Sequence, residues 1–264
     1  MNILLRELKA HRKALIIWSV CMFLLVISGM AKYTAYSGGG DIGAVFDDMP
    51  STMKALLGMG SFDVTTMSGY FAMLFLYIEL TVAIHAVLLG AGIIAKEERD
   101  KTTEFLMVKP VSRTTIITAK LVTALINVIV INIVTFVSSL VMVAAYNKGD
   151  DISSEIAVFF LSLFIVQLIF LSLGAVLAAI MRNPKSAGSL ATGILLLAFM
   201  ISKVTELVKG LGFLNLLSPF KYFSYVNMVE GEGLNIVIVL LSLVLVAAFV
   251  ACTYLSYNKR DMNI

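Results

Sequence analysis

The 264-residue sequence is 59% hydrophobic and only 14% charged, whereas an ordinary soluble domain has about 45–50% apolar and about 25% charged residues. This composition excludes a water-soluble fold. The formal net charge of +3 is spread over short segments, so it gives no indication of nucleic-acid binding. Cys21 and Cys252 lie within apolar runs, where cysteine behaves as a small hydrophobic residue, and neither a disulfide nor a metal site is predicted.

Six apolar segments are long enough to cross a membrane as helices, which takes about 20 mostly apolar residues. They are 14–31, 69–94, 119–146, 154–181, 187–207 and 235–257. The longest connections between them, 32–68 and 208–234, are smaller than most autonomous folds. We therefore predict an all-α integral membrane protein in which 1–264 form a single transmembrane domain.

Lysine and arginine are distributed unevenly between the two sides of this six-helix arrangement. Fourteen of the 20 lie on one side, in 6–13, 96–120, 182–185 and 259–260. Because translocated loops are depleted in both residue types, this side is predicted to be cytoplasmic. The protein is thus expected to be a multi-pass protein of the cell membrane with both termini in the cytoplasm.

Three shorter segments are also predicted to have structure. Residues 1–9 alternate apolar and charged side chains at roughly helical spacing, which favours an N-terminal interfacial helix; the alternative is a cytoplasmic extension of the first span. Pro50 and Gly58 are start and stop signals for a short external helix. The segment 212–223 is too apolar for a free loop and too broken for a span, so it is expected to cap the helices or dip into the outer leaflet.

The connection between the second and third spans is the longest on the cytoplasmic side. Its first part is rich in helix formers of mixed charge and it ends at Pro110, which predicts a short helix over 96–109 parallel to the membrane. A charged face opposite Phe105, Leu106 and Met107 would suit docking into a groove of a cytoplasmic partner. The alternative is a solvated loop.

This connection resembles the signature between the second and third helices of ABC-2 type permeases. The matching residues are Glu97, Thr102, Glu104, Leu106, Pro110-Val111-Ser112-Arg113 and Lys120. The tail Tyr257-Asn258-Lys259-Arg260-Asp261 and the external run Leu217-Ser218-Pro219-Phe220 also resemble segments of that family. One position departs from the pattern, because Lys101 stands where many members have glycine.

The resemblance implies that 96–109 is a cytoplasmic coupling helix that contacts a separate ABC ATPase subunit. The implied coupling residues are Glu97, Glu98, Arg99, Asp100, Thr102, Glu104, Phe105, Pro110 and Arg113. It further implies an exporter built from two ATPases and two permeases, the second permease being another copy or a sister chain, surrounded by membrane lipids.

The sequence contains no phosphate-binding loop of the form G-x-x-x-x-G-K-[S/T]. ATP is therefore expected on the partner subunit. We expect this chain to bind no cofactor, metal or nucleic acid and to have no catalytic residue, so it is not expected to be an enzyme.

Polar residues within spans are costly and are candidates for function. Glu79 lies near the middle of the second span, Asn132 and Gln167 lie at comparable depth, and His85 and Asn127 form a layer nearer the cytoplasm. We take Glu79, His85, Asn132 and Gln167 as candidates for a translocation path. The alternative is that the amides link neighbouring helices and that Glu79 makes a structural hydrogen bond. Glu79 and His85 are about 120° apart on a helix, so they are not expected to pair.

Small residues four positions apart in three spans predict close helix packing. They are Ala86 and Gly90, Gly174 and Ala178, and Ser189 and Gly193.

The sequence is also compatible with two other functions. A proton-coupled secondary transporter could use Glu79, although no internal repeat typical of many such folds is visible. The second alternative is a membrane protein that transports nothing and acts as a partner in a resistance or sensing complex.

The unequal distribution of basic residues predicts the topology. In a variant without Cys21 and Cys252, cysteines introduced at Ser51 and Asp150 should react with an impermeant reagent in intact cells, and one at Asp100 should not. Labelling at position 100 would contradict the six-span arrangement.

Overall fold

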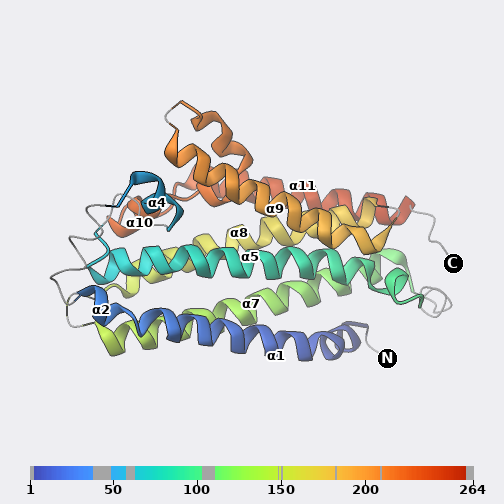
Figure 1. The fold of residues 1–264 in the computed structure, drawn as a ribbon. Coiled ribbons are helices and arrows are strands. Elements are labelled where there is room, and N and C mark those ends of the chain that lie inside the picture. The colour runs from blue at the N-terminus through green and yellow to red at the C-terminus, as the bar shows by residue number, and fades with distance from the viewer. Residues whose placement is uncertain are drawn as a thin grey trace.

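The chain folds as a bundle of long helices, shown by a computed structural model that describes residues 3–37, 49–57, 63–102, 111–147, 149, 151–181, 183–208 and 210–259. Within these residues six helices are long and apolar enough to cross a membrane. They are α1 (Ile3–Met30), α5 (Met67–Arg99), α7 (Arg113–Tyr146), α8 (Ser153–Ile180), α9 (Pro184–Leu207) and α11 (Ile236–Lys259). The predicted all-α membrane fold is confirmed. The N- and C-termini lie at the same end of the bundle (Figure 1).

The shorter elements gather at the opposite end (Figure 1). They are α2 (Tyr33–Ser37), α4 (Ser51–Leu56), the 3₁₀ helices η1 (Gly212–Leu217) and η2 (Pro219–Lys221), and α10 (Tyr225–Val229). Helix α4 occupies the position predicted from Pro50 and Gly58. In the 208–234 connection, the buried Ser218 hydroxyl donates to the carbonyl of Ala198 on α9 at 2.8 Å, and the Phe220 ring packs on Phe170 of α8 with a centroid distance of 5.2 Å. This connection, which we call the cap, therefore folds back against interior turns of α8 and α9. Its position relative to the outer leaflet stays a prediction.

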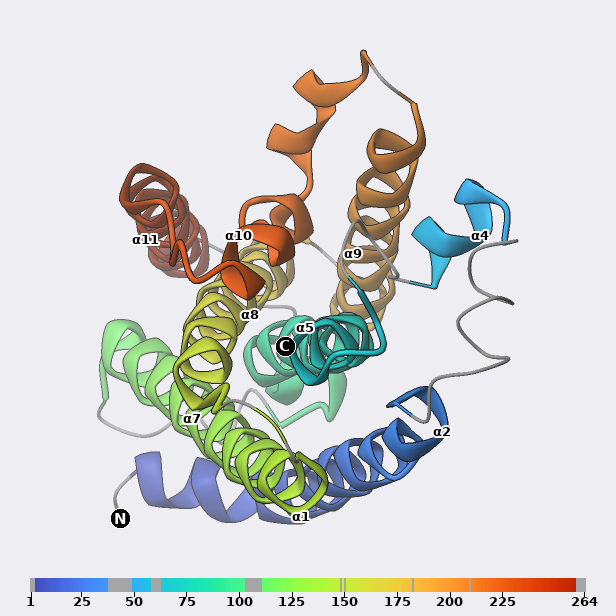
Figure 2. The same cartoon turned by 90° about the vertical axis from the view of Figure 1, so that its left-hand side faces the viewer.

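The predicted interfacial stretch is continuous with the first span. Helix α1 runs without interruption from Ile3 to Met30, and its first turns bend away from the direction of the neighbouring helices (Figures 1 and 2). The location of these turns in the membrane interface stays a prediction.

Helices α5 and α8 form the centre of the bundle, and 67% of the most apolar stretch of each is buried. Their backbones approach so closely that an added Cβ at Gly90 would lie 2.0 Å from the carbonyl oxygen of Leu171, and one at Gly174 would lie 2.3 Å from that of Val87. The prediction of close packing is therefore confirmed at these two glycines. Such small residues allow the dispersion contacts that hold helices together in a membrane.

The α9 pair makes no such close contact among the described residues, so its close packing stays a prediction. Ser189 is exposed, and a Cβ built at Gly193 meets no atom within 4 Å in the described parts of the chain. Small-residue spacing permits a close contact, but it does not determine that a helix lies opposite.

The close approach of α5 and α8 predicts different effects for two neighbouring glycines. Gly90→Ala should lower the unfolding free energy in detergent by about 1–3 kcal/mol, because the methyl group meets rigid backbone. Gly92→Ala on the same helix is the control, because its Cβ would meet nothing within 4 Å. Chemical denaturation of both variants checks this, and equal stability of the two would contradict the packing.

Candidate coupling site

The predicted coupling helix does not begin at Lys96, because helix α5 continues through Arg99. The residues Lys96 to Arg99 are strong helix formers without a helix breaker, so they extend α5 by one turn. The Asp100 amide still donates to the Lys96 carbonyl at 2.9 Å. The prediction of a helix over the rest of the segment is untested, because Glu104, Phe105 and Pro110 lie outside the described residues.

Helix α5 ends at a backbone conformation that favours glycine. Lys101 has a φ of 54°, and the amide of Thr102 donates to the carbonyl of Glu97 at 2.8 Å. This is the Schellman arrangement, in which the residue after the cap adopts the left-handed conformation. A side chain there costs roughly 1–2 kcal/mol relative to glycine. The departure noted in the sequence thus falls where the backbone favours the glycine of the family pattern.

A buried ion pair joins α5 to α7 just before this helix end. The Lys120 ammonium contacts the Glu97 carboxylate and also donates to the carbonyl of Ile93. The two charged side chains are only 1% and 6% exposed. Removing either partner would leave an uncompensated buried charge, so Glu97 is a structural anchor and not an exposed docking residue.

The neighbouring residue on α5 forms a second ion pair, with α1. Lys96 donates to the carboxylate of Glu7 at 3.1 Å, and the Glu7 side chain is 3% exposed. Consecutive helix residues point about 100° apart. Lys96 and Glu97 can therefore reach two different helices, so that one turn of α5 is connected to both α1 and α7.

Residues at the other end of the connection contact α11. Ser112 caps α7 by accepting from the amide of Thr115 at 3.2 Å. Arg113 donates to the carbonyls of Tyr257 and Asn258 at 3.4 and 3.2 Å. A cation is favourable at a helix C-terminus, where the carbonyls lack partners. Two segments that resemble the family in sequence, the Pro-Val-Ser-Arg turn and the C-terminal tail, are therefore in contact.

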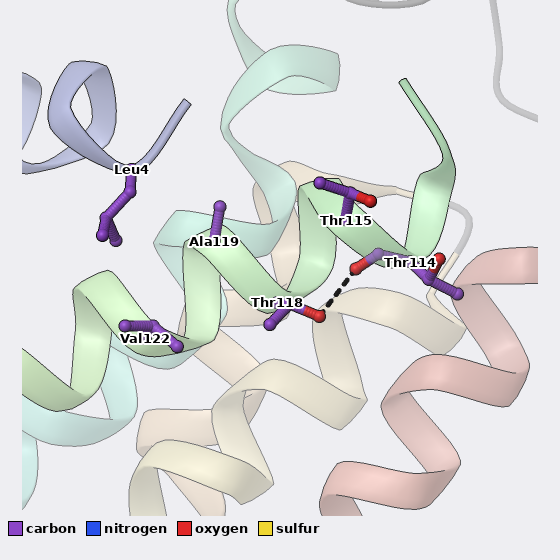
Figure 3. A pocket seen from close by; sticks show the side chains of 6 residues that line it. All are labelled: Leu4, Thr114, Thr115, Thr118, Ala119 and Val122. Atoms are coloured by element: carbon purple, nitrogen blue, oxygen red, sulfur yellow. Dashed lines mark hydrogen bonds between the residues drawn. The ribbon is translucent and has the colours of Figure 1, made fainter. Parts of the chain in front are cut away.

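A hollow of about 370 Å³ lies beside this region, between the start of α1 and the first turns of α7. Figure 3 shows Leu4 on one side and Thr114, Thr115 and Thr118 on the other. The Thr118 hydroxyl bonds the Thr114 carbonyl at 2.8 Å, and the other two hydroxyls bond Ser112, each at 2.8 Å. Because these hydroxyls already have partners, we assign no ligand to the hollow.

The candidate path residue Glu79 lies under the cap formed by the 208–234 connection. It is 2% exposed and accepts a hydrogen bond from the Tyr225 hydroxyl of α10. The Tyr225 ring also packs edge-on against Phe75, with a centroid distance of 5.6 Å. The sequence reasoning missed Tyr225, and no local spacing could have identified it.

The other candidate path residues make contacts with helices α1, α7 and α8, and none of the described contacts is with Glu79. Asn132 on α7 donates to Gln167 on α8 at 2.9 Å, which is the predicted alternative of an interhelical amide link. His85 packs edge-on against Trp18 of α1 at 5.0 Å, and its Nδ1 is buried without a hydrogen-bond partner in the described part of the chain. The described contacts therefore do not bring Glu79, His85 and the amide pair into one site.

A second charged cluster near Glu79 was also missed. Glu206 binds Lys203 of α9 at 3.3 Å and Lys221 of η2 at 3.4 Å. Both lysines act electrostatically on Glu79. Only the Lys203 to Glu206 spacing of three residues could have indicated part of this cluster.

The six apolar helices and the ion pairs between their ends define a multi-pass α-helical membrane protein. The family model described as ABC-2 family transporter protein matches residues 1–262. The chain therefore belongs to the ABC-2 family and is a membrane subunit of an ABC transporter. A search of curated proteins gave no significant match.

The buried ion pair predicts a non-additive effect of mutation. Lys120→Met and Glu97→Gln alone should each lower the unfolding free energy by about 3 kcal/mol, because each leaves one charge unpaired. The double variant removes both charges and should recover most of that loss. Denaturation in detergent checks this with a double-mutant cycle, and additive losses would contradict the pairing.

The hydrogen bond between Tyr225 and Glu79 predicts that two conservative substitutions lower the stability by different amounts. Glu79→Gln keeps an acceptor for Tyr225, so stability in detergent should change by less than about 0.5 kcal/mol. Tyr225→Phe leaves a buried carboxylate without its donor and should cost about 1–3 kcal/mol. If Glu79→Gln is the more damaging variant, the hydrogen bond does not determine the stability of this region.

Proposed function

We propose that this chain is the permease of an ABC exporter and that a separate ATPase subunit supplies the energy through the 96–113 segment. The proposal rests on the charged contacts that hold both ends of this segment to neighbouring helices. Its first residues are tied to α1 and α7 by the pairs Lys96–Glu7 and Lys120–Glu97. Its last residue, Arg113, is tied to the end of α11.

These links offer a physical route for coupling. Force applied to the connection would act on the adjoining ends of α1, α5, α7 and α11 together, because each is held by a charged contact rather than by apolar packing alone. Coupling between sites requires an element whose arrangement both sites bias. The connected helix ends are our candidate for that element.

The residues available to an ATPase are those that follow the ion-paired residues Lys96 and Glu97 in the chain. The side chains of Arg99 and Asp100 are 49% and 46% exposed, and Lys101 is also exposed. We propose that they contact the partner together with residues 103–109. The largely bare surfaces of α1 and α11, of whose apolar stretches only 17% and 11% are buried, leave room for a second permease and for lipid.

A proton-coupled secondary transporter is the second candidate. The observation that favours it is the burial of an ionisable carboxyl group, Glu79, within a spanning helix. Such groups mark ion pathways in many transporters. Its contact with Tyr225 gives Glu79 a structural role as well, so the energy source of transport must separate the two candidates.

The coupling proposal predicts that charge reversal at the exposed end of α5 weakens ATPase binding. Arg99→Glu combined with Asp100→Lys should reduce the amount of co-purified ABC ATPase by about tenfold, the equivalent of one lost charged hydrogen bond. Membrane insertion and thermal stability should be unchanged. Glu230→Lys is the matched control, because Glu230 is exposed and follows α10 at the opposite end (Figure 1).

Transport into inverted vesicles then distinguishes the energy sources. The proposed exporter should require ATP and the ATPase subunit. If the wild-type chain binds no ABC ATPase, and transport continues without nucleotide and follows a proton gradient, the secondary transporter is the correct function.

A further inference from the structure

A groove of about 710 Å³ lies between α8, α9 and α11, below η1 and η2. Figure 2 shows α9 and α11 diverging on either side of α8, with the segment that carries η1 and η2 at the end nearest the viewer. Most of its lining is apolar, including Leu173, Ile194, Leu241, Leu245 and Phe249. Its volume is within the range of about 300–1,000 Å³ for small-molecule sites.

The length of the groove matches one leaflet of a bilayer. On α11 the lining extends from Ile238 to Phe249, which is roughly 16 Å at the rise of an α-helix. Half of a typical hydrocarbon core is about 15 Å. The groove starts at the end of the bundle opposite the termini, so it would cover the leaflet on that side.

Polar groups occur where the groove meets the capping segment. Asn215, Lys221 and Tyr222 line it, and the Oδ1 atom of Asn215 is buried without a hydrogen-bond partner in the described part of the chain. Lys221 shares its counter-ion, because the same Glu206 carboxylate also binds Lys203. The mouth of the groove therefore contains an acceptor without a donor among the described residues, Asn215 Oδ1, and the ammonium group of Lys221, whose counter-ion Glu206 is shared with Lys203.

The polar groups at the mouth favour a phospholipid over an apolar helix of a second copy. The ammonium group of Lys221 and the Oδ1 atom of Asn215, which lacks a donor among the described residues, are suited to a charged headgroup. A hydrocarbon chain of the lipid would meet the apolar wall. An attached anionic headgroup with a donor would satisfy the polar mouth.

We propose that this groove binds one acyl chain of a phospholipid. The phosphate would lie against Lys221, and a hydroxyl or amine of the headgroup would donate to Asn215 Oδ1. This site goes beyond the proposed export function, because its occupancy requires neither ATP nor an ATPase.

Native mass spectrometry of the full-length protein tests the headgroup contacts, with phosphatidylglycerol and phosphatidylcholine as probes. Phosphatidylglycerol carries hydroxyl donors and a net negative charge that phosphatidylcholine lacks, so it should bind at least about fivefold more tightly, the factor expected for one hydrogen bond. Asn215→Ala should lower this preference by about that factor, and Lys221→Ala should weaken both lipids and remove the part of the preference that depends on charge. Equal binding of both lipids to the wild-type protein would refute the headgroup assignment.

Two tryptophan substitutions on α11 test the groove itself. Leu241→Trp should fill it and reduce phosphatidylglycerol binding severalfold. Val244→Trp is the matched control, because Val244 is exposed and lies outside the groove lining. Equal loss in both variants would show that the lipid does not enter the groove.

Photocrosslinking keeps the test independent of how the variants fold. Phosphatidylglycerol with a photoreactive acyl chain should label wild-type α8, α9 and α11 within the groove, and labelling confined to other helices would overturn the proposal. A second result would also overturn the proposal. If Leu241→Cys, in a variant without Cys21 and Cys252, forms an efficient disulfide between two copies of the chain, the groove is a dimer interface.

Discussion

A buried lysine sets the arrangement of the end of the bundle that carries the termini. Lys120 has almost no contact with solvent, and its charge is balanced by Glu97 one helix away. Because an uncompensated ion in such a place is costly, α5 and α7 must meet at these residues. The preceding residue on α5, Lys96, reaches α1 through Glu7. At the start of α7, Arg113 reaches the end of α11. The ends of four helices are thereby joined around the connection proposed to meet the ATPase.

The opposite end is organised differently. There the connection between α9 and α11 folds onto the bundle, and Tyr225 covers the carboxylate of Glu79. Close backbone contact between α5 and α8 at Gly90 and Gly174 joins the two ends through the centre. We infer a division in which one end receives force and the other contacts lipid, with α5 extending between the coupling connection and the lipid-facing cap.

The sequence predicts the six spans because their signal is local: each requires only a long apolar run. It also predicts the short helix after Pro50. It does not predict which charged residues pair, because the partners are 23 residues apart for Lys120 and Glu97, 89 for Lys96 and Glu7 and 146 for Tyr225 and Glu79. The start of the coupling helix was wrong because helix formers continue a helix as readily as they begin one. The close packing predicted at Gly193 is not seen within the described residues, because spacing cannot show whether a helix lies opposite.

Spin-label distances in the complex with its ATPase test most directly whether the ion pairs transmit motion. Labels at Leu5 on α1 and Leu255 on α11 would sit on exposed positions of two helices that the connection joins. We expect ATP binding to change this distance in the otherwise wild-type protein. The change should be lost when Lys120→Met and Glu97→Gln are combined, with the fold retained. The same ATP-dependent change in both proteins would show that the ion pairs do not transmit the motion.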